Sequence, residues 1–401
     1  MLRTLKLTNF RTCVATEVSF EPVTLLIGKN NSGKTNICQA LEFMGAAAQA
    51  DSLDNAARML GLPPLEVVTR YLPGEPVTLR IEASAPWGDE ELDYRYELVI
   101  SCTDLGPSPG HVLNVVSEHL SVTVDGEEWR LMEREGAEVR LLHETRPQAG
   151  VREPRVETTA PPRQAMIARL LDLADNPRAN AFRQYLRSWR YYTISAEIMR
   201  TSRRADWDTF LADDASNVAS VLFTLKSEDT RAFNRLVSLV KEIEPSIETL
   251  NFIRPRPEEV YMEVEDTEGN RYNPESLSDG TLNYLALCYV ALQGSLRTAR
   301  DTVPPALVAY EEPERGLYVG HLRRFMEVLQ EAGKTQQVIL TTHNPYLIDL
   351  FEDHREQVRL VSRGEHSLRD GTTVAAPDAD KLDGLLESFS LGELYYRELL
   401  Q

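Results

Sequence analysis

The spacing of hydrophobic and polar positions changes several times along the 401 residues of the chain. Apolar and polar residues alternate over 2–8 and 15–20, which predicts two strands of an antiparallel edge. A continuous apolar run at 23–27 predicts a buried strand, and apolar residues three and four positions apart over 37–48 predict a helix. The start of the chain therefore combines strand and helix patterns.

Further changes in the hydrophobic spacing divide the chain into four segments. Alternation returns after residue 76, and Asp125-Gly126 between two alternating runs strongly favours a hairpin turn. After a connector rich in proline and arginine, helical spacing dominates, and strands return near residue 246. We therefore expect a first core segment, an antiparallel β insert, a helical lobe with a basic connector, and a second core segment, over residues 1–75, 76–145, 146–245 and 246–401.

The strand predicted at 23–27 leads into GKNNSGKT, residues 28–35, which fits the phosphate-binding pattern G-x-x-x-x-G-K-[ST]. Glycines let successive N–H groups turn toward an anion, and the start of the next helix adds its positive end. Lys34 is expected to reach the β- and γ-phosphates, and the Thr35 hydroxyl to bind Mg²⁺. A flexible turn without a ligand is the alternative, which the flanking strand and helix disfavour. The expected nucleotide contacts are Gly28, Lys29, Asn30, Asn31, Ser32, Gly33, Lys34, Thr35 and Asn36.

A capped helix is predicted near the C-terminal third. Ser278 stands at the N-cap position of an apolar helix expected over 282–296, and Gly280 would let a ligand approach closely. By itself this pattern is that of an ordinary core helix.

Two apolar strands with polar ends follow. The strand predicted at 306–310 ends in Glu311 and Glu312, carboxylates that suit a metal ligand and a base for an attacking water. The strand at 337–341 precedes His343, which could hydrogen-bond a γ-phosphate. Taken alone, the two glutamates could belong to an ordinary acidic loop and His343 could be a structural histidine. What favours a nucleotide site is that all the motifs occur together, in this order, along the chain.

Charge and cysteine usage limit the partners. The net charge of −19 argues against indiscriminate coating of nucleic acid, although residues 146–204 hold twelve arginines and five acidic residues. This basic band is either a phosphate-facing surface or a set of arginines that pack helices. The four cysteines and seven histidines show no metal-ligand spacing, and no apolar run approaches the roughly 18 residues of a membrane span. We expect a cytoplasmic protein without structural zinc or membrane contact.

The motif order resembles that of ABC-type ATPases of the SMC-like branch, which includes RecF and the ATPase half of OLD nucleases. Residues 1–48 and 273–360 carry the resemblance, and Asn9-Phe10-Arg11 is similar to the segment that precedes the phosphate loop in this family. Residues 213–219 and 391–396 are similar to short OLD-like members. The implied fold is an α/β P-loop NTPase of ABC type, a twisted and mostly parallel sheet with an antiparallel β lobe and an inserted helical lobe.

The resemblance also implies roles. Residues 28–35 correspond to the Walker A loop, and the cofactors are ATP and Mg²⁺, with the metal held by Thr35 and Glu311. Catalysis falls to Glu312 as general base, assisted by Lys34 and His343. Three further residues would contact nucleotide, two of them in the signature motif that acts across a homodimer: Ser278, Gly280 and Arg11.

Some positions depart from the family pattern. Glu311 replaces the usual aspartate, Leu317-Tyr318-Val319 stands where Leu-His-Pro is common, and no glutamine is assigned to the Q-loop. The length leaves no room for a C-terminal Toprim nuclease, so a nuclease is expected to be a separate polypeptide. The implied function is an ATP-hydrolysing dimerisation switch that gates DNA or an effector, a nuclease or toxin, in DNA repair or anti-phage defence. The alternatives are the ATP-binding subunit of a transporter, or an ATP-bound scaffold or sensor that hydrolyses little.

Overall fold

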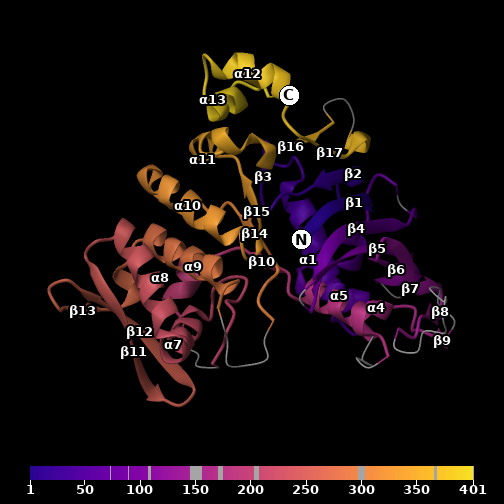
Figure 1. Cartoon of the computed structure of the whole chain (residues 1–401), viewed down its shortest axis with the longest axis horizontal. Coiled ribbons are helices and arrows are strands. Elements are labelled where there is room, and N and C mark those ends of the chain that lie inside the picture. Colours follow the sequence, from indigo (N-terminus) through magenta and orange to yellow (C-terminus); the bar gives the residue numbers. More distant parts are fainter. Residues whose placement is uncertain are drawn as a thin grey trace. The chain divides into compact units, whose positions relative to one another are not determined.

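The computed structural model describes residues 1–72, 74–88, 90–106, 110–144, 156–169, 175–202, 207–296, 303–364 and 368–400. The chain divides into two compact units (Figure 1). The first unit comprises Met1–Glu21, Leu26–Trp189 and Arg359–Pro377, and the second comprises Pro22–Leu25, Arg190–Val358 and Asp378–Gln401. Each unit therefore draws on distant parts of the sequence.

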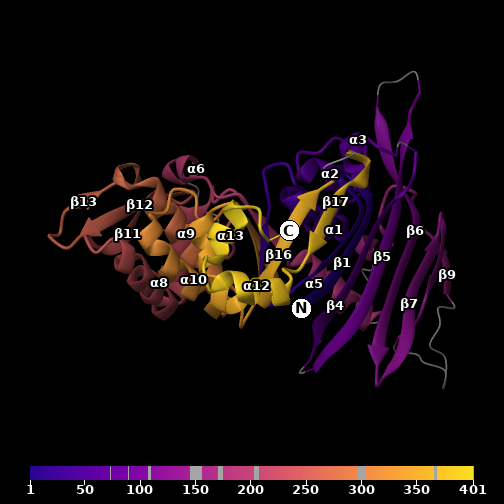
Figure 2. The same cartoon turned by 90° about the horizontal axis from the view of Figure 1, so that it is seen from above.

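An antiparallel sheet forms much of the first unit, with the order β2-β1-β4-β5-β6-β7-β8-β9. Figure 2 shows the long strands β4 to β7 side by side. Leu5 of β1 pairs with Ile81 of β4, and Leu7 pairs with Leu79, so their buried side chains continue one apolar face. The predicted meander is thus present, but it extends the N-terminal hairpin instead of forming a separate insert. The strands are β1 (Leu2–Phe10), β2 (Cys13–Ser19), β4 (Val77–Trp87), β5 (Glu90–Asp104), β6 (His111–Val124), β7 (Glu127–Glu135), β8 (Glu138–Leu141) and β9 (Val156–Thr159).

Helices of the first unit pack on this sheet. Helix α5 contacts both β4 and α1, and the ring of Phe182 stacks on Tyr94 with 4.8 Å between centroids. Strands β16 and β17 pair with each other in antiparallel fashion. The bounds are α1 (Lys34–Ala47), α2 (Leu53–Met59), α3 (Pro64–Val67), α4 (Met166–Arg169), α5 (Pro177–Arg187), β16 (Val358–Arg363), η4 (Leu368–Asp370) and β17 (Thr372–Ala375).

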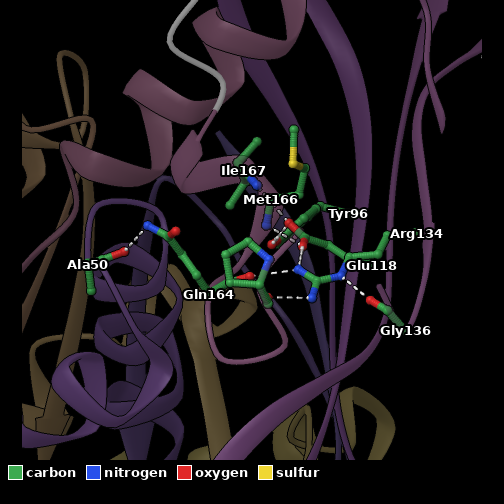
Figure 3. A network of polar contacts seen from close by, with 9 residues as sticks. Ala50, Tyr96, Glu118, Arg134, Gly136, Gln164, Met166 and Ile167 are labelled. Carbon is green, nitrogen blue, oxygen red and sulfur yellow. Dashed lines mark hydrogen bonds and ion pairs between the residues drawn. The ribbon is translucent and has the colours of Figure 1, made fainter. Parts of the chain in front are cut away.

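Two buried charged side chains fasten the segment before α4 to the sheet (Figure 3). Glu118 accepts hydrogen bonds from two backbone N–H groups at the start of α4, at 2.6 and 2.9 Å, and from the Tyr96 hydroxyl at 2.9 Å. Arg134 donates to three backbone carbonyl oxygens at 2.7, 2.6 and 2.8 Å and lies 3.8 Å from Glu118. Gln164, which supplies one of these carbonyls, donates from its side chain to Ala50 at 3.2 Å. Both carboxylate oxygens of Glu118 and all three guanidinium nitrogens of Arg134 are therefore hydrogen-bonded.

The second unit contains a parallel sheet. Strand β14 (Leu307–Glu311) pairs in parallel with β10 (Arg190–Tyr192) on one side and with β15 (Gln337–Thr342) on the other. The first residues of β3 (Val23–Ile27) lie next to β15, and the strand passes into the first unit after Leu25. Because nearly all residues of these strands are buried, they match the expectation of a buried parallel sheet.

Helices and a small antiparallel sheet complete the second unit. The predicted apolar helix is α9 (Asp279–Gln293), which packs against α8 (Thr230–Ile243) and α10 (Leu322–Ala332). Helix α7 (Val218–Glu228) packs on α8, and α11 (Pro345–Asp349) packs on α13 (Leu391–Tyr396). The remaining elements are α6 (Ala196–Arg200), β11 (Ile247–Arg256), β12 (Glu259–Asp266), β13 (Arg271–Tyr272), η1 (Pro274–Ser276), η2 (Val319–His321), η3 (Glu352–Gln357) and α12 (Ala379–Leu386).

The segment predicted as a helical lobe, 146–245, is divided between the units at Trp189. Helix α5 of this segment belongs to the first unit, whereas α7 and α8 belong to the second. Within the described part of the chain, no helix is long and apolar enough to cross a membrane.

Several arginines of the basic band pack against their own unit. Arg178 lies over the rings of Trp87 and Trp129, 5.2 Å from each centroid, and Arg183 is buried. Arg200 donates a hydrogen bond to a backbone carbonyl at 2.9 Å. These side chains fit the packing alternative. Two other members of the band, Arg203 and Arg204, lie outside the described residues.

Candidate functional site

The phosphate-loop pattern lies between β3 and α1, as the sequence predicts. Gly28 is buried, and a Cβ built on it would lie 2.1 Å from the carbonyl oxygen of Val361. Gly33 has φ of 112°, and a Cβ there would lie 2.1 Å from the Thr372 hydroxyl oxygen. Both positions therefore require glycine for steric reasons, whereas Lys29 and its two following asparagines are exposed on the outside of the loop.

The loop has the donors that a triphosphate needs. The buried Lys34 donates from Nζ to the carbonyl oxygens of Gly28 at 2.6 Å and Lys29 at 3.0 Å, so its ammonium group lies over the loop. The hydroxyl of Ser32 is buried and has no hydrogen-bond partner among the described residues. Phosphate oxygens would supply acceptors to both groups. The residues present therefore fit a bound nucleotide, and their individual roles stay predictions.

A hydrogen-bonded chain links this loop to the β1–β2 turn. Thr372 of β17 donates to the backbone carbonyl of Ser32 at 3.0 Å, and its hydroxyl lies 2.8 Å from that of Thr12. Asn36 donates to the Thr12 hydroxyl at 2.6 Å and accepts from Nε of Arg11 at 2.8 Å. Four segments of the first unit thus hold one another in place around the start of α1.

Arg11 lies beside Asn36, directly after the phosphate loop. Its φ of 50° places it in the left-handed region, where the tight β1–β2 turn holds it. Burial lowers the pKa of the Arg11 guanidinium, and Glu66 acts in the opposite direction. Arg11 also lines a cavity of about 280 Å³ together with Arg70, Tyr71 and other residues. A cationic cavity next to the loop suits the rest of a nucleotide, and contact between Arg11 and the nucleotide stays a prediction.

In the second unit the structure brings Glu312 and His343 together. Glu312 follows β14 in the left-handed region, with φ of 45°, and its N–H donates to the carbonyl oxygen of Thr341 at 3.0 Å. Nδ1 of His343 lies 2.8 Å from Oε1 of Glu312. Because Nδ1–H then donates to the carboxylate, Nε2 is left as the nitrogen that can meet another group. Parallel strands that end at one edge of a sheet explain why residues distant in sequence meet here.

Glu311 has a partner that sequence reasoning missed. The hydroxyl of Tyr191, on the short strand β10, donates to Oε2 of Glu311. A cavity of about 600 Å³ adjoins this contact, and it is lined by the loop after β10, the start of α9 and the loop after β14. Three aromatic residues close together, Trp189, Tyr191 and Tyr192, were the available signal, but a three-residue strand shows no periodicity.

Ser278 is the N-cap of α9, as predicted. Its Oγ accepts from the N–H of Thr281 at 3.1 Å, and both Ser278 and Asp279 are exposed. A Cβ on Gly280 would lie 2.3 Å from the carbonyl oxygen of Gly316, so the loop after β14 supplies a steric reason for this glycine. Arg200 pairs with Asp279 at 2.7 Å and steadies the same helix start. A role for Ser278 and Gly280 toward a second copy stays a prediction.

Two family profiles match the chain. The profile described as "AAA domain, putative AbiEii toxin, Type IV TA system" matches residues 146–349, which is more than half of the chain. The profile described as "AAA ATPase domain" matches residues 1–119. A search of proteins with curated descriptions found no match.

Solved structures of SMC head domains are similar to this chain. The SMC head bound to the C-winged helix domain of ScpA has 13% identity and a TM-score of 0.51, over 95% of this chain and 99% of that chain. The SMC head domain from Thermotoga maritima has 13% identity and a TM-score of 0.44, over 94% and 99%. That from Pyrococcus furiosus, bound to the C-terminal domain of ScpA, has 14% identity and a TM-score of 0.47, over 96% and 98%.

The first of these structures shows the fold, which is the P-loop fold of SMC heads and ABC-type ATPases. This confirms the expected α/β class, and the two profiles identify the activity as that of an ATPase. The OLD-like part of the resemblance stays a prediction. With an SMC-like ATPase fold and a profile match over residues 146–349, the chain belongs to the family described as AAA domain, putative AbiEii toxin, Type IV TA system.

Proposed function

We propose that this ATPase is a dimerisation switch that uses ATP and Mg²⁺ to control a partner effector. One observation carries the proposal. Nδ1 of His343 lies 2.8 Å from Oε1 of Glu312, the residue that follows Glu311 in the sequence. A general base needs a defined orientation near the reacting water, and a hydrogen bond from a neighbouring donor favours one orientation.

The proposed reaction is hydrolysis of the terminal phosphoanhydride. Glu312 accepts a proton from water while the water oxygen bonds to the γ-phosphorus and the bond to the β–γ bridging oxygen breaks. Lys34 neutralises charge on the departing phosphates, and His343, as an imidazolium with protons on both nitrogens, donates from Nε2 to the γ-phosphate while Nδ1 donates to Glu312. Thr35 and Glu311 would hold Mg²⁺, which supplies positive charge to the β- and γ-phosphates when bound.

The start of α9 supports a role for a second copy. Ser278 and Asp279 are exposed at the positive end of a 15-residue helix, where backbone N–H groups favour an anion. We propose that this helix start meets the γ-phosphate bound by the other copy of a homodimer. ATP would then hold the two copies together, and hydrolysis would release them.

The proposed output is control of an effector protein, a toxin or a nuclease, in the cytoplasm. The family description names a putative toxin of a type IV toxin–antitoxin system, and the similar SMC head is bound to a domain of ScpA. An ATPase of this fold that carries a partner protein therefore has a precedent. DNA stays a possible target of the same switch, within DNA repair or anti-phage defence.

Replacing Glu312 by glutamine tests the proposal. The substitution keeps the shape of the side chain and removes the base, so Glu312→Gln is expected to bind ATP, to stop hydrolysing it and to sediment as a dimer. The double variant with Lys34→Ala is the control, since it should remain monomeric in the same ATP concentration. A Glu312→Gln protein that stays monomeric with ATP bound contradicts the switch.

A further inference from the structure

Glu314, two residues beyond Glu312, is a buried acidic side chain that the proposed reaction does not use. Only 7% of its surface is exposed. Its Oε1 accepts a hydrogen bond from the Thr342 hydroxyl, and its Oε2 is buried with no hydrogen-bond partner in the described part of the chain. A buried carboxyl group with one oxygen unpaired is costly, and it persists where it has a task.

Thr342 connects Glu314 to the backbone on both sides of His343. It is the last residue of β15, directly before His343, and it is fully buried. Its Oγ1 donates to Glu314 and also accepts from the N–H of Asn344 at 3.0 Å. The side chain of Thr342 thus fixes the turn that carries His343 and ties this turn to the loop after β14.

Two contacts therefore join the loops after β14 and β15. The outer contact, between Glu312 and His343, is partly exposed, with 27% and 49% of the side chains accessible. Water competes with such a pair, so it holds its own geometry weakly. The inner contact, between Glu314 and Thr342, is shielded from water, where a hydrogen bond is stronger and its loss is costlier.

We infer that Glu314 is a positioning residue that acts through Thr342 to hold His343 against Glu312. This inference rests on the proposed function, because it assumes that Glu312 and His343 act in hydrolysis. It explains why the strand end carries a third glutamate after Glu311 and Glu312. It also gives the left-handed backbone of Glu312 a second support, besides its bond to Thr341.

The hydrogen bond between Glu314 and Thr342 can be tested with pairs of substitutions, one that keeps the bond and one that removes it. Burial and the nearby Glu312 raise the pKa of the Glu314 carboxyl group, so a neutral amide of the same shape should replace it. Glu314→Gln keeps the acceptor for the Thr342 hydroxyl, whereas Glu314→Leu removes it. Likewise Thr342→Ser keeps a hydroxyl, whereas Thr342→Val removes it at nearly unchanged volume.

Steady-state ATPase kinetics on these four variants test the inference, with the Glu312→Gln protein alongside. Thr342→Val and Glu314→Leu are expected to lower kcat by roughly 10- to 100-fold with little change in KM, because a misplaced catalytic group mainly slows chemistry. Thr342→Ser and Glu314→Gln should keep kcat within about threefold. Thermal melting of each protein checks the fold, and Thr342→Ala replaces Thr342→Val if the latter is unfolded.

A combination with His343→Ala separates positioning from general destabilisation. If Thr342 acts through His343, Thr342→Val should change kcat little further in the His343→Ala background. Two results would overturn the positioning role. One is that the losses of kcat from Thr342→Val and His343→Ala add up in the double variant. The other is that Thr342→Val and Glu314→Leu are both folded and fully active. Activity that survives Glu312→Gln would instead overturn the proposed function, so the two failures are distinguishable.

Discussion

Gly280 and Gly316 meet backbone to backbone, and a Cβ on Gly280 would lie 2.3 Å from the carbonyl oxygen of Gly316. Asn283, one turn further along α9, donates to the carbonyl oxygen of Arg315 at 2.8 Å. The start of α9 is therefore docked onto the loop that begins with Glu312. Any shift of this loop would move the exposed Ser278 as well.

Gly280→Ala should accordingly destabilise the protein. The added methyl group meets backbone that cannot rotate away, so we expect a loss of about 1–3 kcal/mol in the free energy of unfolding. Gly384→Ala, in the exposed helix α12 where a Cβ meets nothing within 4 Å, is the control. It should be neutral or stabilise by up to about 1 kcal/mol. Urea unfolding measures both, and equal stabilities would contradict the docking argument.

Lys34→Ala should abolish measurable ATP binding. The ammonium group lies over the carbonyl oxygens of the loop, where phosphates would bind, and phosphates depend on such a cation. Titration with a fluorescent ATP analogue gives the affinity. Lys6→Ala, which removes an exposed ammonium paired with Glu17 on the same unit, should bind like the unchanged protein. Unaltered affinity in Lys34→Ala would refute the loop assignment.

Arg134→Leu should be strongly destabilising. Arg134 and Glu118 are both fully buried, and removal of Arg134 leaves the Glu118 carboxylate without an opposite charge, at a cost of about 3–5 kcal/mol. Adding Glu118→Gln should recover part of this loss, because glutamine is neutral and its one amide oxygen can still accept from the N–H of Ile167 and from Tyr96. Chemical denaturation of the single and double variants gives the comparison. A double variant less stable than Arg134→Leu would show that the charge of Glu118 is not the cause.

Glu314 predicts a pH dependence of stability. Its pKa is raised by burial and by Glu312, while Thr342 and His343 act in the lowering direction. The folded state therefore holds the proton more tightly than the unfolded chain. Stability from this group is present below the ordinary glutamate pKa and is lost as pH rises toward the folded value. The stability of Glu314→Gln relative to the unchanged protein should thus increase as the pH rises from 4.5, the ordinary glutamate pKa. A relative stability that falls as the pH rises would reverse the assigned sign.

Local pattern was enough to predict many elements. The alternation over 2–8, the apolar spacing of 37–48 and the N-cap Ser278 each correspond to an observed strand, helix or cap, because neighbouring residues determine them. The meeting of Glu312 and His343 at one sheet edge follows from strands that run in the same direction. The local features could be predicted because each needs only a short stretch of sequence, whereas the roles of Glu312 and His343 stay predictions.

Other features depend on long-range pairing that no local pattern records. The pairing of β1 with β4 makes the expected β insert part of the N-terminal sheet. Tyr191 and Glu311 are 120 residues apart, and Thr342 and Glu314 are 28 apart, so only the folded sheet brings these side chains together. The steric need for glycine at position 280 likewise comes from a turn 36 residues away along the sequence.

Thr372 has a consequence for biosynthesis. The ribosome makes the phosphate loop within the first 35 residues, yet the hydroxyl that secures Ser32 and crowds Gly33 is added only at position 372. Chains grow from the N-terminus, and contacts so distant in sequence form late. A nascent polypeptide should therefore lack a finished nucleotide cradle until Thr372 has left the ribosome.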